Sequence, residues 1–175
     1  MGERLRTCHG FEVSAFATPM KTMIEALLVE LGIDYRWLFE RELKEQPIPG
    51  LNVSARHLMR TLGTEWGRTH LGATWWVRCT EIALGMHGHT AATFHPVHDR
   101  IVLTDVRFPE EAAWIRSWGG VIVRIERPGQ AAIPLATHSS ELQPIRADRI
   151  VLNDGSLDQL HERVDLLAAA LLSSN

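Results

Sequence analysis

The segment Gly63–Arg68 places an indole, a carboxylate and a guanidinium close together, in the order Gly63-Thr64-Glu65-Trp66-Gly67-Arg68. An indole can stack on a flat heterocycle. A carboxylate accepts hydrogen bonds, and a guanidinium can hold a phosphate with two parallel hydrogen bonds. The segment therefore suits the binding of a nucleotide. The structural alternative is a corner between two helices around a buried tryptophan, and the residue types alone lean toward that alternative.

A second pair of candidates, Asp105 and Arg107, follows the strand-like run Ile101–Thr104. Ligands of open parallel sheets bind at the carboxyl ends of the strands. A carboxylate at such a place can orient a hydrated magnesium ion, and an arginine two residues later can reach a phosphate. An ion pair at the end of a strand, with a role in capping the next helix, explains the same spacing equally well.

Four histidines, His87, His89, His95 and His98, lie close together in the sequence. A His-x-His pair can bind a metal ion, but no acidic or thiol partner stands at a recognised spacing. We therefore interpret this segment as a solvated loop and predict no metal site there. The segment His138–Glu141 is expected to lie between two strands as a lid or cap.

The second half of the chain predicts strand, helix and strand in a short space. Ile101–Thr104 is expected to be a strand buried on both faces. Pro109 and the acidic residues after it begin a helix, which Gly119 and Gly120 end. Val121–Ile125 is the next strand, parallel to the first, since short units of this kind cross over in one hand.

The remaining elements are predicted from caps and periodicity. Ile150–Leu152 is a third strand, and Ser156 with Gln159 forms a capping box for the last helix, with Leu160, Val164, Leu167 and Leu171 on its core face. Four further elements are expected: a strand within Phe11–Ala17, a helix capped by Thr18, a helix from Ser54 to Leu62, and a helix over Thr74–Met86 with Trp75, Cys79, Ile82 and Met86 on one side.

Composition limits the class of protein. The chain has 175 residues, 45% hydrophobic, with a net charge of -3. This length predicts a single domain over residues 1–175, and the charge disfavours a nucleic-acid binder. No apolar run approaches the roughly 20 residues that span a membrane, and the N-terminus has no signal-peptide core, so a cytoplasmic location is expected.

Several of these strings, taken in order, resemble the phage-type deoxynucleoside monophosphate kinases. Phe16–Lys21 resembles that family's Phe-Ala-Asp-Pro-Leu-Lys, with Thr18 in place of the usual aspartate. The other matching strings are Ser54–Arg68, Thr104–Ala112, Gly119–Gly129 and Asn153–Leu157. A more distant likeness to phosphomevalonate kinase, through the strand-end Asp-x-Arg and a Ser-Glu before the last strand, leaves the acceptor partly open.

The resemblance implies an adenylate-kinase-like α/β fold, with a three-layer parallel sheet between flanking helices. It also implies transfer of the γ-phosphoryl group of ATP to a deoxynucleoside monophosphate, with Mg²⁺. Asp105 and Arg107 would then lie near the reacting phosphates as catalytic residues, and Arg127 would bind substrate near the mobile cover or donor side, with Arg124. The acceptor-binding residues implied are Arg56, Thr64, Glu65, Trp66 and Arg68. A homodimer is expected, and base preference stays open.

The sequence departs from the family at the donor site. Members begin with a strand, a Gly-x-x-x-x-Gly-Lys-[Ser/Thr] loop and a helix, whereas no Gly-Lys pair occurs in this chain. That loop wraps the donor phosphates in backbone N–H groups. We therefore expect the first strand and the loop to be missing, and phosphoryl transfer to fail.

Three interpretations of this departure are open. The chain is part of a working kinase whose loop was lost from the sequence, or a kinase-derived nucleotide-binding or regulatory protein without catalysis, or a structural protein that kept the scaffold. The last is disfavoured, because Gly63–Arg68 and the Asp105–Arg107 pair have no obvious structural use as a set.

Overall fold

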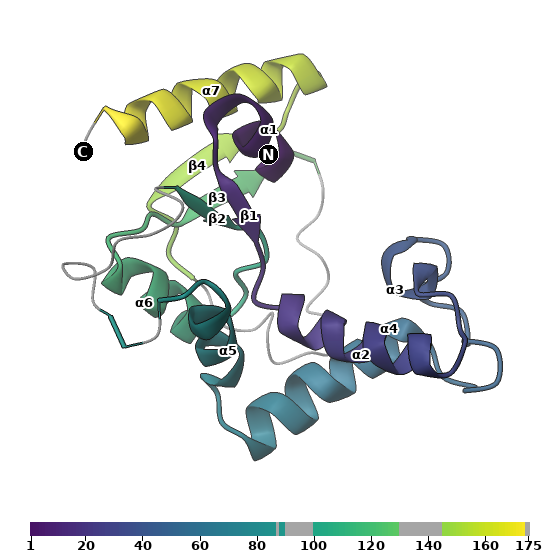
Figure 1. Cartoon of the computed structure of the whole chain (residues 1–175). Helices are drawn as coiled ribbons and strands as arrows, with labels where there is room; N and C mark the ends of the chain where they lie inside the picture. The colour runs from purple at the N-terminus through teal and green to yellow at the C-terminus, as the bar shows by residue number, and fades with distance from the viewer. Residues whose placement is uncertain (87, 90–99, 130–144, 174–175) are drawn as a thin grey trace. The chain divides into compact units, whose positions relative to one another are not determined.

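The computed structural model describes residues 1–86, 88–89, 100–129 and 145–173. The chain divides into two compact units, one made of Met1–Ala15 and Gly88–Asn175, the other of Phe16–His87 (Figure 1). Within the described ranges, no helix is both long enough and apolar enough to cross a lipid bilayer. The first unit is therefore discontinuous in sequence, and the second is inserted within it.

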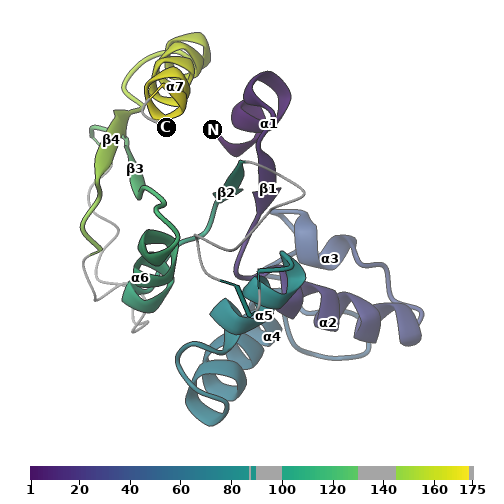
Figure 2. The ribbon, with the colours of Figure 1, turned by 60° about the vertical axis from the view of Figure 1, so that its left-hand side comes forward.

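The first unit contains two pairs of parallel strands (Figure 2). Strand β1 (Glu12–Ser14) pairs with β2 (Ile101–Leu103), and β3 (Val123–Glu126) pairs with β4 (Arg149–Leu152). The predicted mixed α/β class with parallel strands is confirmed. The expectation that the 101–104 strand is buried on both faces is wrong, because β2 is only partly buried. Among the described residues β1 alone flanks it.

Helix α6 (Pro109–Ser117) lies between β2 and β3, as predicted. The carboxylate of Glu111, only 4% exposed, accepts hydrogen bonds from the backbone N–H groups of Arg107 (2.7 Å) and Phe108 (3.0 Å). At the other end, the N–H of Gly120 donates to the carbonyl of Ile115 (2.9 Å), and Gly119 adopts a φ of 76°. Both ends of the helix are thus closed by the chain itself.

Helix α7 (Leu157–Leu172) begins at the predicted capping box of Ser156 and Gln159. Leu160 and Val164 are buried as expected, but Ala168 completes the buried set in place of Leu171. They pack in one cluster with Leu5 and Val151.

Helix α1 (Gly2–His9) was not predicted, because its sequence is polar and has only one buried residue, Leu5. It lies against α7 (Figure 1), and Asp165 of α7 connects the two helices. The Asp165 carboxylate accepts hydrogen bonds from Arg4 (2.6 and 2.9 Å) and lies 2.8 Å from Nε2 of His9. Interactions with a distant aspartate therefore hold a helix whose own pattern is weak.

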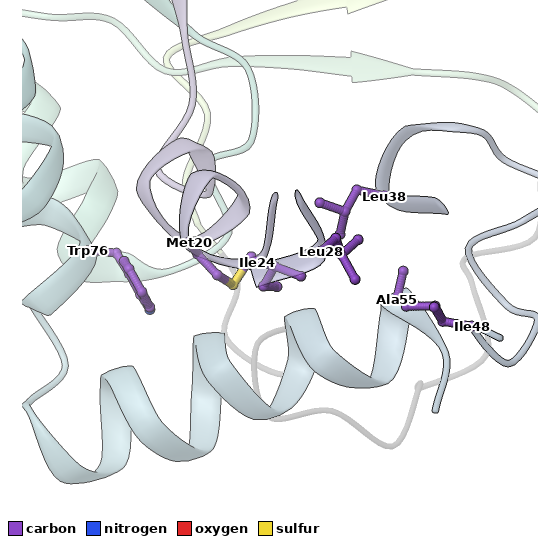
Figure 3. Close-up of a cluster of buried hydrophobic side chains, with 7 residues drawn as sticks. All are labelled: Met20, Ile24, Leu28, Leu38, Ile48, Ala55 and Trp76. Carbon is purple, nitrogen blue, oxygen red and sulfur yellow. The ribbon is translucent and has the colours of Figure 1, made fainter. Parts of the chain in front are cut away.

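The core of the second unit gathers on α2 (Thr18–Glu30), through Met20, Ile24 and Leu28. Figure 3 shows these side chains with the rest of the cluster, namely Leu38, Ile48, Ala55 and Trp76. The N-cap of α2 is Ala17, so Thr18 is the first helical residue and not the cap. Leu38 comes from the short helix α3 (Arg36–Phe39).

Helix α4 (Ala55–Arg60) is capped by Ser54, whose side chain accepts a hydrogen bond from the N–H of His57 (3.1 Å), as predicted. The helix does not stop at Leu62. It continues as a π-helix, η1 (Thr61–His70), so the expected corner at Gly63 is wrong. Long π-helices are rare and are found mostly at functional sites.

Helix α5 (Trp75–Ala83) buries Trp76, Val77 and Thr80. The predicted inner side is right in part: Met86 is buried and Trp75 and Cys79 pack against the core, but Ile82 is 60% exposed. The inner side is shifted by one residue, or about 100° around the helix. Trp76 is therefore the side chain that α5 directs toward η1.

The pH dependence of stability tests the contact between α1 and α7. Arg4, and then His9, lower the pKa of Asp165. A carboxyl group with a depressed folded-state pKa stabilises the fold above its unfolded pKa, about 3.9, and this stabilisation is lost as the pH falls through the folded value. We predict that Asp165→Asn lowers the melting temperature at pH 7, and that its difference from wild type narrows below about pH 4.

The matched control is Glu3→Gln on α1, because Glu3 pairs with Arg6 of the same helix at an exposed position. Exposed ion pairs contribute little to folding stability, so this variant should have a melting temperature close to that of the wild type at every pH tested. Thermal unfolding followed by circular dichroism at several pH values measures both. A deficit of Asp165→Asn that is constant from pH 7 to pH 3 contradicts the assignment.

Glu111 gives a second test. We predict that Glu111→Ala destabilises the fold by about 1–3 kcal/mol, because two backbone N–H groups lose a buried acceptor. Glu111→Gln keeps one acceptor oxygen and should lose less. Urea unfolding of the three proteins gives the comparison, and an alanine variant as stable as wild type refutes the role.

Candidate functional site

The predicted acceptor segment lies on η1, where four of the candidate residues follow one another within a turn. Trp66 is 38% exposed, so the structure does not bury it as the structural alternative required. Its ring meets that of Trp75 edge-on (centroids 6.1 Å apart, 88°) and is tilted against that of Trp76 (6.3 Å, 48°). Trp66 is therefore supported on one side while part of its surface stays open to solvent.

The polar residues around Trp66 differ in how firmly they are held. Glu65 is exposed, and Thr64 is half-buried with its carbonyl accepting from the hydroxyl of Thr69 (3.1 Å). Nη1 of Arg68 donates to the carbonyl of Ala73 (2.9 Å), which orients part of the guanidinium along the turn before α5. One helix thus presents a carboxylate, an indole and an oriented cation.

Arg56 lies on α4 and forms an ion pair with Glu45 on the surface. Its backbone N–H donates to the carbonyl of Lys44 (3.0 Å), which holds this part of α4 against the preceding loop. Arg56 therefore belongs to the same unit as Gly63–Arg68.

Asp105 and Arg107 lie in the other unit, where the structure places them just past the carboxyl end of β2. The N–H of Thr104 donates to the carbonyl of Ser14 (3.1 Å), so the parallel pairing continues to the residue before Asp105. Asp105 is half-buried and Arg107 is exposed. The backbone N–H groups at the start of α6 are capped by Glu111, which separates the helix-capping role from the Asp105–Arg107 pair.

Arg127 follows β3 directly and is exposed. The N–H of Asn153 donates to the carbonyl of Glu126 (2.7 Å), so Arg127 stands where the β3–β4 pair ends. His87, His95 and His98, and the segment 138–141, lie outside the described residues. His89 is described and exposed.

The donor set can be compared with what magnesium and ATP need. Magnesium is usually held through one or two carboxylates, waters and substrate phosphates. Asp105 fits that need as a single carboxylate, and no group of three or more metal-binding side chains occurs among the residues that the structure describes. The triphosphate of ATP fits less well, because the amides of Arg107 and Phe108 already bond to Glu111.

Sequence reasoning missed two parts of this arrangement. Trp75 and Trp76 support Trp66, and the adjacent pair of tryptophans at the start of α5 was the available signal. Glu111 was recognised only as part of an acidic first turn. A glutamate at the third helical position, behind a proline, is also the mark of a carboxylate that folds back on the helix start.

Comparison with known proteins places the chain in a family. A family model described as deoxynucleotide monophosphate kinase matches residues 40–164, a range that contains every candidate residue above. A provisionally named deoxynucleotide monophosphate kinase of Acanthamoeba polyphaga mimivirus is 26% identical over 167 residues, 89% of this chain and 81% of that protein. The deoxynucleotide monophosphate kinase of Enterobacteria phage T4 is 29% identical over 113 residues, 63% of this chain and 44% of that enzyme's length. The chain belongs to the deoxynucleotide monophosphate kinase family.

Proposed function

We propose that this chain binds a deoxynucleoside 5′-monophosphate on the exposed side of η1, as the acceptor part of a nucleoside monophosphate kinase. The family match over residues 40–164 supports this, because it includes the whole of η1. The observation that carries the proposal is the half-exposed Trp66, which rests on two other indoles beside the exposed carboxylate of Glu65.

Each side chain of the segment has a proposed task. The open face of Trp66 stacks on the base, and Glu65 accepts hydrogen bonds from the base or sugar. Arg68 and Arg56 hold the phosphate, while the half-buried Thr64 contributes its hydroxyl. Arg56 must exchange Glu45 for the phosphate, and this costs little because exposed ion pairs are weak.

For the chemical step, we propose that Asp105 and Arg107 stand near the reacting phosphates. Asp105 would orient a water of a bound magnesium ion, and Arg107 would hold a phosphate oxygen with its exposed guanidinium. Magnesium, when bound, neutralises charge on the phosphates. Arg127 would contribute a further cation at the end of β3. In this proposal the two parallel pairs are parts of a three-layer, adenylate-kinase-like sheet, and the 175 residues form one domain.

A non-catalytic nucleotide-binding protein is the second candidate, and two observations favour it. The chain has no Gly-Lys pair, and Glu111 occupies the amides at the start of α6. Stabilisation of transition-state charge is usually the largest catalytic contribution, so the chain as given should bind an acceptor without transferring phosphate.

Calorimetry tests the binding proposal. We predict that at least one of dGMP, dTMP, dCMP and dAMP binds the 175-residue chain, and that Trp66→Ala weakens binding about tenfold or more, since stacking on a base contributes about 1–3 kcal/mol. The matched control is Phe39→Ala, another half-exposed aromatic of the same unit, which packs edge-on against Tyr35 outside the segment. If calorimetry detects no binding of any of the four nucleotides to the wild-type chain, the proposal is wrong.

A coupled assay tests catalysis. We predict no phosphoryl transfer from ATP and magnesium to any of the four nucleotides by these 175 residues, because they contain no Gly-Lys pair for the donor phosphates. Turnover at a usual kinase rate, about 1–100 per second, would overturn this prediction and remove the second candidate. A positive control with a complete nucleoside monophosphate kinase confirms the assay.

A further inference from the structure

The indole of Trp76 on α5 meets two glycines of η1, the carbonyl group of Gly63 and the Cα of Gly67. Trp76 is 6% exposed and belongs to the core cluster of its unit. Its Nε1 donates a hydrogen bond to the carbonyl of Gly63 (2.7 Å). Figure 3 shows the indole extending from α5 toward the helix that carries these glycines. The contact therefore joins a side chain of one helix to the backbone of the other.

Gly67 is required by this contact. A Cβ at position 67 would lie 2.5, 2.6 and 2.7 Å from Nε1, Cε2 and Cζ2 of Trp76. Those separations are far inside van der Waals contact, and the indole, locked in the core, has little room to move. Gly63 is also restricted, since its Cβ would meet the sulfur of Met20 at 2.8 Å. Gly67 therefore lets the indole of Trp76 lie directly on the helix backbone, and Gly63 leaves room for Met20.

The same indole supports the exposed ring of the proposed site. Trp66 directly precedes Gly67, and its ring is tilted against that of Trp76 at 6.3 Å. If Trp76 moved, η1 would lose its hydrogen bond to the indole and could shift relative to α5. The ring of Trp66 would also lose part of its support. Trp75 also touches Trp66, but its buried Nε1 has no hydrogen-bond partner in the part of the chain that the structure describes.

We propose that Trp76, seated on Gly63 and Gly67, is a positioning residue for the nucleotide site on η1. It does not touch the ligand itself. It fixes the segment that carries Thr64, Glu65 and Arg68 through one hydrogen bond to the backbone, and it fixes the ring of Trp66 through direct contact. The inference rests on the proposed binding of a deoxynucleoside monophosphate by that segment.

The first test is Trp76→Phe, which keeps an aromatic ring but removes the donor and the atoms nearest Gly67. Trp37→Phe is the matched control, because Trp37 lies on α3 and packs against the same core cluster. We expect Trp76→Phe to raise the calorimetric Kd for the best-bound deoxynucleoside monophosphate about tenfold, and Trp37→Phe to raise it less than about threefold. Each Kd is measured well below the melting temperature of its variant.

Gly67→Ala approaches the same contact from the opposite side and keeps the proposal testable if Trp76→Phe does not fold. We expect Gly67→Ala to weaken binding about tenfold in the wild-type background and by much less in the Trp76→Phe background, since the clashing atoms are then absent. A residue that only packs the core would shift the melting temperature and leave the Kd of the folded protein unchanged.

The outcomes separate the two claims. Wild-type binding with unchanged Kd values in Trp76→Phe and Gly67→Ala overturns the positioning role and leaves the proposed function standing. Equal losses of affinity for Trp37→Phe and Trp76→Phe also overturn it, because the contact of Trp76 with η1 then has no specific effect on binding. Absence of binding by the wild type to all four nucleotides overturns the proposed function, and the positioning role with it.

Discussion

The close approach of an indole to a helix backbone constrains the second unit more than any other contact. Trp76 can lie on η1 because residue 67 has no side chain, and its N–H donates to the carbonyl of Gly63. This contact between Trp76 and η1 orients α5 so that Trp76, Val77 and Thr80 face inward and Ile82 faces out. It also brings three indoles together, with Trp66 outermost. Core packing and the presentation of polar groups are thus consequences of one contact.

In the first unit, two carboxylates hold the fold. Glu111 is buried and bonds to two backbone N–H groups, and Asp165 is joined to Arg4 and His9. Asp105 precedes both in the chain, at the end of a strand, and is half-buried. Because Glu111 serves the start of α6, the residues before it are relieved of that task. Arg107 can present its guanidinium to solvent while its own backbone is fixed.

Local chemistry predicted the helix caps at Ser54 and Ser156, but not the start of α2, where Ala17 and not Thr18 is the N-cap. Ser54, Ser156 and Gln159 signal helix starts through hydrogen bonds to residues three positions away, so no distant partner is needed to recognise them. Helix α1 and the inner face of α5 depend on distant partners, Asp165 in one case and the two glycines in the other. The π-helical continuation past Arg60 was hidden because glycine ordinarily indicates a break. The types of the site residues suit nucleotide binding but lean toward a helix corner around a buried tryptophan, so the exposure of Trp66 and the support beneath it needed the structure.

The insertion of one unit within the other bears on how the chain is made. Strand β1 pairs in register with β2, Glu12 opposite Ile101, so β1 cannot find this neighbour until the segment between them and β2 itself have left the ribosome. The segment Phe16–His87 is continuous and has its own core, so it can collapse while β1 still waits. Pairing over such a sequence separation is slow. Once folded, the inserted unit shortens the effective loop between β1 and β2. Early folding of the proposed nucleotide-binding unit therefore assists the later pairing of these two strands.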